Sequence, residues 1–240
     1  MMMEIDPLIL EVHQKRALKI VLATLARCLI VSNFLADALH TYHHWHLERI
    51  ALTMSWHCSY WVAGVYISLL AMAQVMGSLF LVVLKRRFLA TGVLWLAAHL
   101  RMAANPVLWS LPRYMELCGL ISAILMLMLK SRRQAVESFL LITYLNCKDL
   151  DSIVWHIVYK YFLRLLLVFV MVRFRVRLST GLLVLLLALH SMDKHMWSKE
   201  SFHENSLAMR DLKRFHFWNK VSLTGGLILT AVSTRFYFIF

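Results

Sequence analysis

The cleanest apolar run of this chain covers Tyr60 to Leu84, 25 residues without Asp, Glu, Lys or Arg. A helix needs about 20 mostly apolar residues to cross the hydrocarbon core of a bilayer, so this stretch is long enough to span a membrane. Further apolar runs cover residues 18–39, 88–104 and 111–129. The chain is 60% hydrophobic and 16% charged, which excludes a disordered chain and argues against a soluble enzyme. The sequence predicts an all-α, polytopic transmembrane helix bundle of about six or seven helices.

The net charge of +13 is concentrated in clusters that flank the apolar runs. Cytosolic ends of membrane helices collect Lys and Arg, and this rule explains the charge better than binding to nucleic acid, which we do not expect. The cluster at 15–19 assigns residues 1–17 to the cytosol. The clusters at 85–87 and 130–133 return the chain to the cytosol twice, which predicts a four-helix first part over residues 18–133.

The C-terminal third of the chain, residues 153–240, is expected to hold further helices of a single membrane domain. Residues 134–152 read as a cytosolic connector, because the apolar run 139–144 is too short to span. Residues 198–214 are polar and are predicted to lie in water or among lipid headgroups on the non-cytosolic side. A further crossing after the connector would place the basic cluster Arg173–Arg177 on the non-cytosolic side, against the rule that such clusters are cytosolic. One element after the connector is therefore expected to be missing, re-entrant or lying flat in the membrane surface.

The most conspicuous polar cluster contains His40, His43, His44 and His46. Helical spacing places the first three on one face, and imidazole is a common metal ligand. No carboxylate or cysteine completes a recognised metal-ligand spacing, however, and amphipathic aromatic side chains are typical of an interfacial loop. No nucleophile elbow, phosphate loop or dinucleotide fingerprint occurs either. We therefore expect no metal site, no cofactor and no enzymatic activity.

Charged residues inside predicted spans give a second clue. Arg27 and Arg101 lie within apolar runs, and an arginine at mid-bilayer costs about 2.5–3.5 kcal/mol, so each is expected to face a partner or a cavity. For Arg101, extension of the side chain to the headgroups is the alternative. Gly225 and Gly226 lie in the last apolar run and predict a close contact between helices.

One block of this sequence runs from Ala26 to Trp45 and continues to Tyr60, and a second runs from Asp211 to Gly226. Both blocks resemble the surfeit locus protein 4 family. The resemblance covers about residues 20–130 and 173–233, with further matches at Arg49, Gln74, Gly77, Leu108 and Trp109.

This resemblance implies a multispanning cargo receptor of the endoplasmic reticulum and early Golgi membranes. Such receptors collect soluble secretory proteins in the lumen by their N-terminal segments and bring them to vesicle coat components. The chain departs from the family pattern at Ala36–Ala38, where one of two acids is absent, at Glu116–Leu117, and around residue 172, where about one helix is lacking. It ends at Phe240 without a Lys-rich tail. These departures predict a divergent paralogue in which retrieval through a dilysine signal is not expected.

A receptor that recognises the N-terminus of its cargo must bind an α-ammonium group. A carboxylate in an aromatic pocket is well suited to bind this group. The implied cargo-binding residues are Asp37 with Trp45, Trp56 and Tyr60, followed by Asp193 and Asp211. The alternative for Asp37 is a helix-end residue that is solvated or paired with Arg49. Two other classes of protein stay open: a transporter or channel whose Arg27 and Arg101 line an anion route, and a membrane-embedded enzyme that uses the histidines or Cys58.

Overall fold

A computed structural model of the whole chain is entirely α-helical over its described residues, which are 7–83, 86–105, 108–128, 132–146, 154–194 and 206–234. Nine helices occupy these ranges: α1 Pro7–His43, α2 Trp45–Trp56, α3 Tyr60–Val82, α4 Arg87–Ala104, α5 Leu111–Met128, α6 Arg132–Asn146, α7 Val154–Met171, α8 Val176–Lys194 and α9 Ser206–Thr234.

The first four predicted spans correspond to α1, α3, α4 and α5. Among the described residues, three stretches are long and apolar enough to cross a membrane, at Val12–His43, Tyr60–Val82 and Leu111–Met128. The expected loop after the first span is instead the short helix α2, which ends at His57 in the left-handed conformation (φ 50°). That residue turns the chain from α2 into α3, so α2 caps one end of the bundle.

Helix α6 occupies most of the segment that the sequence analysis read as a connector. It packs against α5 and buries Phe139 and Leu140 in the main core. Its apolar run is short, but a helix enclosed by other helices needs an apolar stripe only on its buried faces. The expected connector over residues 134–152 thus contains a helix that packs into the bundle; residues 147–152 lie outside the described residues.

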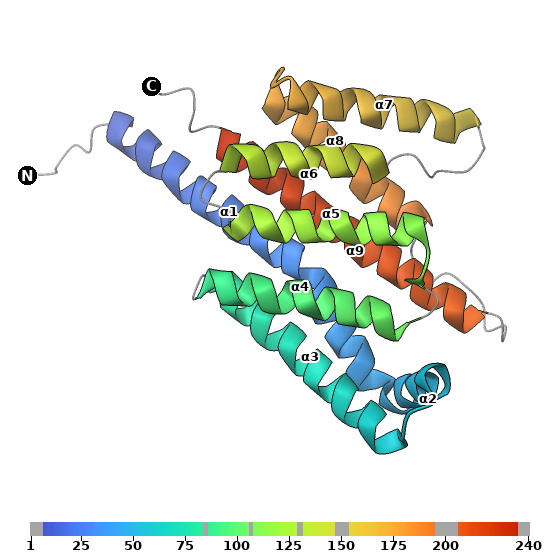
Figure 1. Cartoon of the computed structure of the whole chain (residues 1–240). Helices are drawn as coiled ribbons and strands as arrows, with labels where there is room; N and C mark the ends of the chain where they lie inside the picture. The colour runs from blue at the N-terminus through green and yellow to red at the C-terminus, as the bar shows by residue number, and fades with distance from the viewer. Residues whose placement is uncertain are drawn as a thin grey trace, which may run out of the picture.

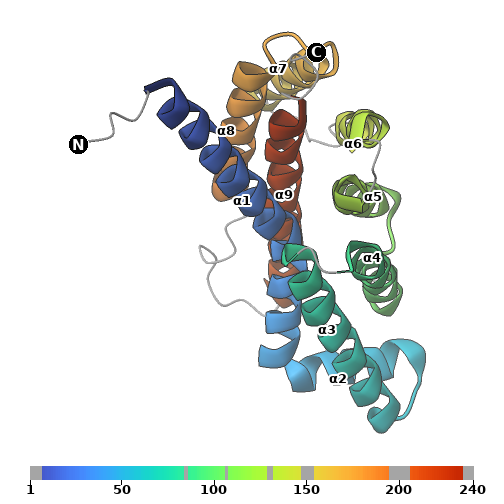
Figure 2. The same cartoon turned by 90° about the vertical axis from the view of Figure 1, so that its left-hand side faces the viewer.

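The helices form two neighbouring layers (Figures 1 and 2). Helices α4, α5 and α6 lie side by side in one row, and α1, α8 and α9 lie beside it. The long helices α1 and α9 pack along each other in opposite directions. Helices α2 and α3 cover one side of this pair, and α7 lies against α8 at the other. Pairing of α1 with α9 thus joins the two ends of the sequence at the centre of the bundle.

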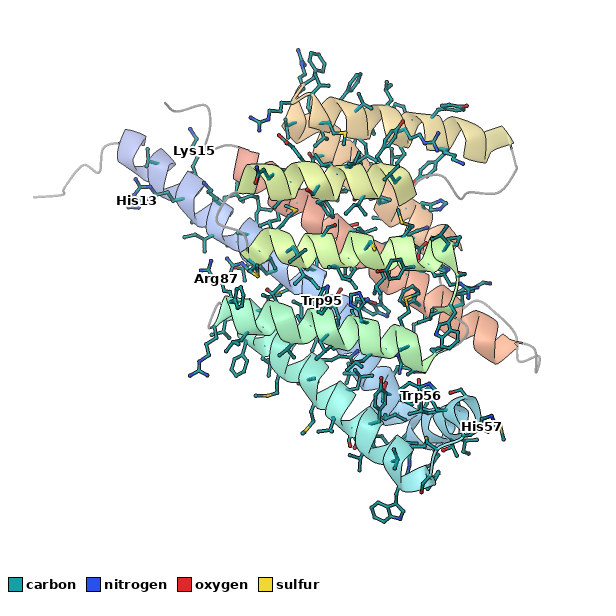
Figure 3. The ribbon with its side chains drawn as sticks, viewed as in Figure 1. His13, Lys15, Trp56, His57, Arg87 and Trp95 are labelled. Carbon is teal, nitrogen blue, oxygen red and sulfur yellow. The ribbon has the colours of Figure 1, made fainter. Side chains whose placement is uncertain are left out.

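When α6 is counted as a membrane crossing, all the basic clusters fall on the same side of the membrane. The start of α1, the α3–α4 turn, the α7–α8 turn and the end of α9 all lie toward one end of the bundle (Figure 1). We call this the basic end, because it carries Lys15, Arg87, Arg173 and Arg175. Figure 3 places Lys15 and Arg87 there, with Trp56 at the opposite end. If α6 crosses the membrane, the cluster Arg173–Arg177 falls on the same side as the earlier basic clusters, and no element after residue 150 needs to be missing.

Candidate functional site

A cavity of about 930 Å³ opens near the end of the bundle opposite the basic end. It lies among α1, α2, α3, α4, α5 and α9, at the place where α2 folds over the bundle. Most of its wall is apolar, with side chains such as Phe34, Leu47 and Leu117. The charged and titratable residues of the wall are Asp37, His40, His43, His44, Glu48, Arg101, Arg113 and Arg214.

Arg101 of α4 is the centre of an ion-pair network in this wall. Its Nη1 and Nη2 donate to the two carboxylate oxygens of Glu48 at 3.1 and 2.9 Å, which is a bidentate arrangement. The same Nη2 lies 3.1 Å from Oδ1 of Asp37. Only 13% of the Arg101 side chain is exposed, so this arginine is held inward by two acids rather than extended to the headgroups.

Asp37 of α1 is contacted from three other helices. Gln74 of α3, itself buried, donates from Nε2 to Oδ2 at 2.8 Å, while Arg101 approaches Oδ1. Nη2 of Arg214, in α9, lies 3.8 Å from the same Oδ1. Both oxygens of Asp37 therefore face donors supplied by the protein. Together with Glu48 of α2, the network joins five helices.

The register between α1 and α9 brings Asp37 and Arg214 to the same level. Ser222 donates from Oγ to the carbonyl oxygen of Leu29 at 3.1 Å, which fixes how the two antiparallel helices align. Asp37 lies eight residues after Leu29, and Arg214 lies eight residues before Ser222, so the two charged residues meet two turns further along.

Gly225 permits this alignment, because a Cβ there would lie 2.7 Å from the carbonyl oxygen of Ala26. At Gly226 a Cβ would lie 2.6 Å from the ring of Phe139 in α6. Both glycines therefore stand at helix contacts too close for any side chain, one against α1 and one against α6.

Arg214 belongs to the segment that the sequence analysis placed in water or among lipid headgroups. In the structure α9 begins at Ser206, so residues 206–214 continue the last helix instead of forming a loop. The Arg214 side chain is only 13% exposed and turns toward the cavity. The opposite charge of Asp37 offsets the cost of removing it from water.

The histidines after Asp37 lie beside the network. The rings of His40 and His44 stack with centroids 4.2 Å apart, and Nδ1 of His40 lies 3.6 Å from Oε1 of Glu48. His46 instead turns toward Tyr60, with Nδ1 and the phenol oxygen 3.3 Å apart. Within the described part of the chain, no three His, Cys, Asp or Glu side chains gather closely enough to hold a metal ion.

The three aromatic residues expected to surround Asp37 lie outside the cavity wall. Trp45 packs against the small core cluster of Leu52, Ala63 and Ile67. Trp56 contacts Tyr66 with ring centroids 5.0 Å apart. Tyr60 carries the guanidinium of Arg49 over its ring at 3.6 Å, so Arg49 is engaged there and not with Asp37. The aromatic residues that do line the cavity are Phe34, Tyr42, Tyr66, Phe215 and Trp218.

The remaining expected site residues are placed as follows. Asp193 lies near the end of α8 and Asp211 in the first turns of α9, but the side chains of both fall outside the described part of the structure. Arg27 lies in α1, partly buried and outside the cavity wall. Of the expected cargo-binding and intramembrane polar residues that the structure describes, Asp37 and Arg101 line the cavity, and His40, His43 and His44 line it beside them.

The sequence contained a signal for this pairing. Asp37 lies near the non-cytosolic end of the first span and Arg101 near the same end of the third, so the two have similar depth in a membrane. A buried arginine requires an acid, and depth alone would have matched these two. Glu48 and Arg214 carried no such signal, because both lie in segments that read as solvated.

The described helices, their basic end and the enclosed network of charges define a multi-pass helical membrane protein. A family model described as the SURF4 family matches residues 10–148. The chain belongs to this family. The match includes Asp37, Glu48, Gln74 and Arg101, while Arg214 lies beyond it.

A curated relative named surfeit locus protein 4 homolog, from Drosophila melanogaster, is 23% identical over 233 residues. That alignment covers 88% of this chain and 85% of the relative. No solved structure matches.

Proposed function

We propose that this chain is a membrane cargo receptor that binds soluble secretory proteins in the endoplasmic reticulum lumen. It promotes their export to the Golgi in coated vesicles, acts without catalysis, and resides in the endoplasmic reticulum and early Golgi membranes. Membership of the SURF4 family supports this proposal. The observation that carries it is the cavity of about 930 Å³ at the end of the bundle opposite the basic end.

The cavity has the size and lining of a site for a peptide segment. Ligand pockets commonly enclose about 300–1,000 Å³ and combine an apolar wall with a few fixed polar groups. Here the fixed groups are Asp37, Glu48 and Arg101, whose ion pairs hold five helices together around the opening. A rigid wall lowers the entropy lost when a flexible cargo segment binds.

The two ends of the bundle suit a receptor that joins lumen and cytosol. With the basic end in the cytosol, the cavity faces the lumen, where the N-terminal segments of cargo are exposed. The basic end then faces the vesicle coat components. Asp37 contributes to the cavity by holding Arg101 and Arg214, and an ammonium group of the cargo would have to displace one of them.

The same contacts argue against the two other classes of protein. An anion route through Arg101 is disfavoured because Glu48 and Asp37 neutralise its charge at 2.9–3.1 Å. A general base is disfavoured at this site because the acids bind arginines rather than an activated nucleophile. A network in which both acids are engaged by arginines supports binding without chemistry.

A variant that obstructs the cavity tests the proposal. Ala51 lines the opening and is exposed, so Ala51→Trp fills space without overpacking the core. Ala17→Trp is the matched control, because Ala17 is also exposed but lies near the start of α1, at the basic end. Secreting cells that express each variant are subjected to proximity labelling from the lumenal side.

The wild-type chain and Ala17→Trp are expected to enrich soluble secretory proteins, and Ala51→Trp is expected to lose them at equal expression. A wild-type set that contains only resident membrane proteins would contradict the receptor function. Equal enrichment by Ala51→Trp would contradict the assignment of the cavity.

A further inference from the structure

The charges of the cavity wall do not balance. Two acids, Asp37 and Glu48, face three arginines, Arg101, Arg113 and Arg214. Both acids are already engaged, Glu48 by the bidentate contact with Arg101, and Asp37 by Arg101, Gln74 and Arg214. One positive charge of the wall is therefore left over when the described lining residues are counted.

Arg113 carries that surplus charge. It lies in the first turn of α5, is partly buried, and forms neither a hydrogen bond nor an ion pair with any other described residue. An arginine presents five donors in a planar fork, which matches a carboxylate in two-point contact. A guanidinium that lines a pocket without an acid opposite it is thus suited to an anionic group of a ligand.

Arg214 adds a second positive charge to the same wall. Its Nη2 faces Asp37, and its Nη1 is buried and has no hydrogen-bond partner. Phe34, Leu117 and Leu120 line the same cavity and are part of its apolar wall.

We propose that the ligand of this cavity carries a carboxylate beside apolar side chains, and that Arg113 binds this carboxylate. The inference rests on the proposed function, since it takes the ligand to be a peptide segment of cargo. The carboxylate belongs either to an Asp or Glu side chain or to a chain terminus. A site organised around two arginines selects against a cationic segment at the same position.

Peptide binding to the purified full-length chain tests this inference. The chain is placed in nanodiscs of phosphatidylcholine, and labelled peptides of one apolar sequence are compared that carry Glu, Gln or Lys at a single central position, all with amidated C-termini. A fourth peptide combines Gln with a free C-terminal carboxylate. The Glu peptide is expected to bind at least about tenfold more tightly than the Gln peptide, and the Lys peptide more weakly still.

Variants of Arg113 assign the preference to this residue. Arg113→Gln is expected to abolish the difference between the Glu and Gln peptides, Arg113→Lys to retain part of it, and Arg113→Glu to favour the Lys peptide. Because Arg113 contacts no described partner, these changes break no internal ion pair. Arg87→Gln is the matched control, since Arg87 is exposed at the basic end and is expected to leave all affinities unchanged.

Equal affinities for the three amidated peptides, or a preference that persists in Arg113→Gln, would overturn the inference. So would peptide binding that is lost when phosphatidylserine is added to the nanodiscs, because an anionic lipid would then be the occupant. If the fourth peptide binds as tightly as the Glu peptide, a chain terminus can supply the carboxylate. If it binds only as tightly as the Gln peptide, a side chain supplies it. The two proposals can fail separately. If Ala51→Trp abolishes cargo capture but the charge of the peptide has no effect on its affinity, this inference is refuted and the proposed function stands.

Discussion

Replacement of Arg101 by methionine removes a cation that contacts both Glu48 and Asp37, while it keeps an unbranched side chain of similar reach. The two carboxylates are 21% and 19% exposed, and their nearest cation lies at 2.9–3.1 Å. The variant leaves Glu48 without a cationic partner unless His40 is protonated, and Asp37 with only Gln74 and the more distant Arg214.

Removing one partner of a buried ion pair costs about 3–5 kcal/mol. Because both acids keep some exposure and Arg214 still lies 3.8 Å from Asp37, we expect a loss near the lower limit, about 3 kcal/mol. At roughly 2–4 °C for each kcal/mol in a chain of this size, Tm is expected to fall by about 6–12 °C.

Thermal unfolding of the purified protein in detergent, followed by tryptophan fluorescence, measures this change. Arg87→Met is the control, because Arg87 lies in the same helix but is exposed at the basic end. A triple variant that combines Arg101→Met with Glu48→Gln and Asp37→Asn removes the uncompensated charges and is expected to regain most of the lost Tm.

The reasoning is refuted if Arg101→Met lowers Tm no more than Arg87→Met does. It is also refuted if the triple variant is no more stable than Arg101→Met alone, because the loss would then not arise from unpaired carboxylates.

Three further predictions concern packing, coupling and topology. Gly225→Ala is expected to destabilise the protein by about 1–3 kcal/mol, because the new Cβ meets the Ala26 carbonyl oxygen at 2.7 Å; Gly92→Ala, which has open space, is expected to be neutral in the same Tm measurement. Gln74→Leu is expected to cost about 1–2 kcal/mol in the wild type and much less with Asp37→Asn, and additive losses of Tm would contradict their hydrogen bond. A cysteine at the exposed position 174, in a variant without other cysteines, is expected to react with an impermeant thiol reagent from the cytosolic side of sealed membranes; reaction from the lumenal side would show that α6 does not cross.

Much of the fold was predictable because long apolar runs determine where helices form. The expected spans 60–84, 88–104 and 111–129 agree with α3, α4 and α5 to within about two residues. Helix α6 was missed because hydropathy measures only the apolar content of a window. Its buried contacts depend on Phe139 fitting against Gly226, two residues that are far apart in sequence.

The candidate site was predictable only in part. The cost of burying charge identified Arg101, and the position of Asp37 near a helix end marked it as a candidate, but neither observation named a partner. The partner of each is set by the register of α1 against α9 and by the fold of α2, which bring Arg214 and Glu48 from segments that read as solvated. The surplus charge at Arg113 can be identified only when the ion pairs among Asp37, Glu48, Arg101 and Arg214 are known from the structure.

Site-specific photocrosslinking from the cavity wall tests most directly whether cargo binds there. A photoreactive amino acid at Leu47, which lines the opening and is 56% exposed, is compared with the same group at Leu69, which is 59% exposed on α3 outside the cavity. The account predicts that soluble secretory proteins are captured from Leu47 and that only lipid or membrane proteins are captured from Leu69. Capture of secretory proteins from neither position, or equally from both, would contradict it.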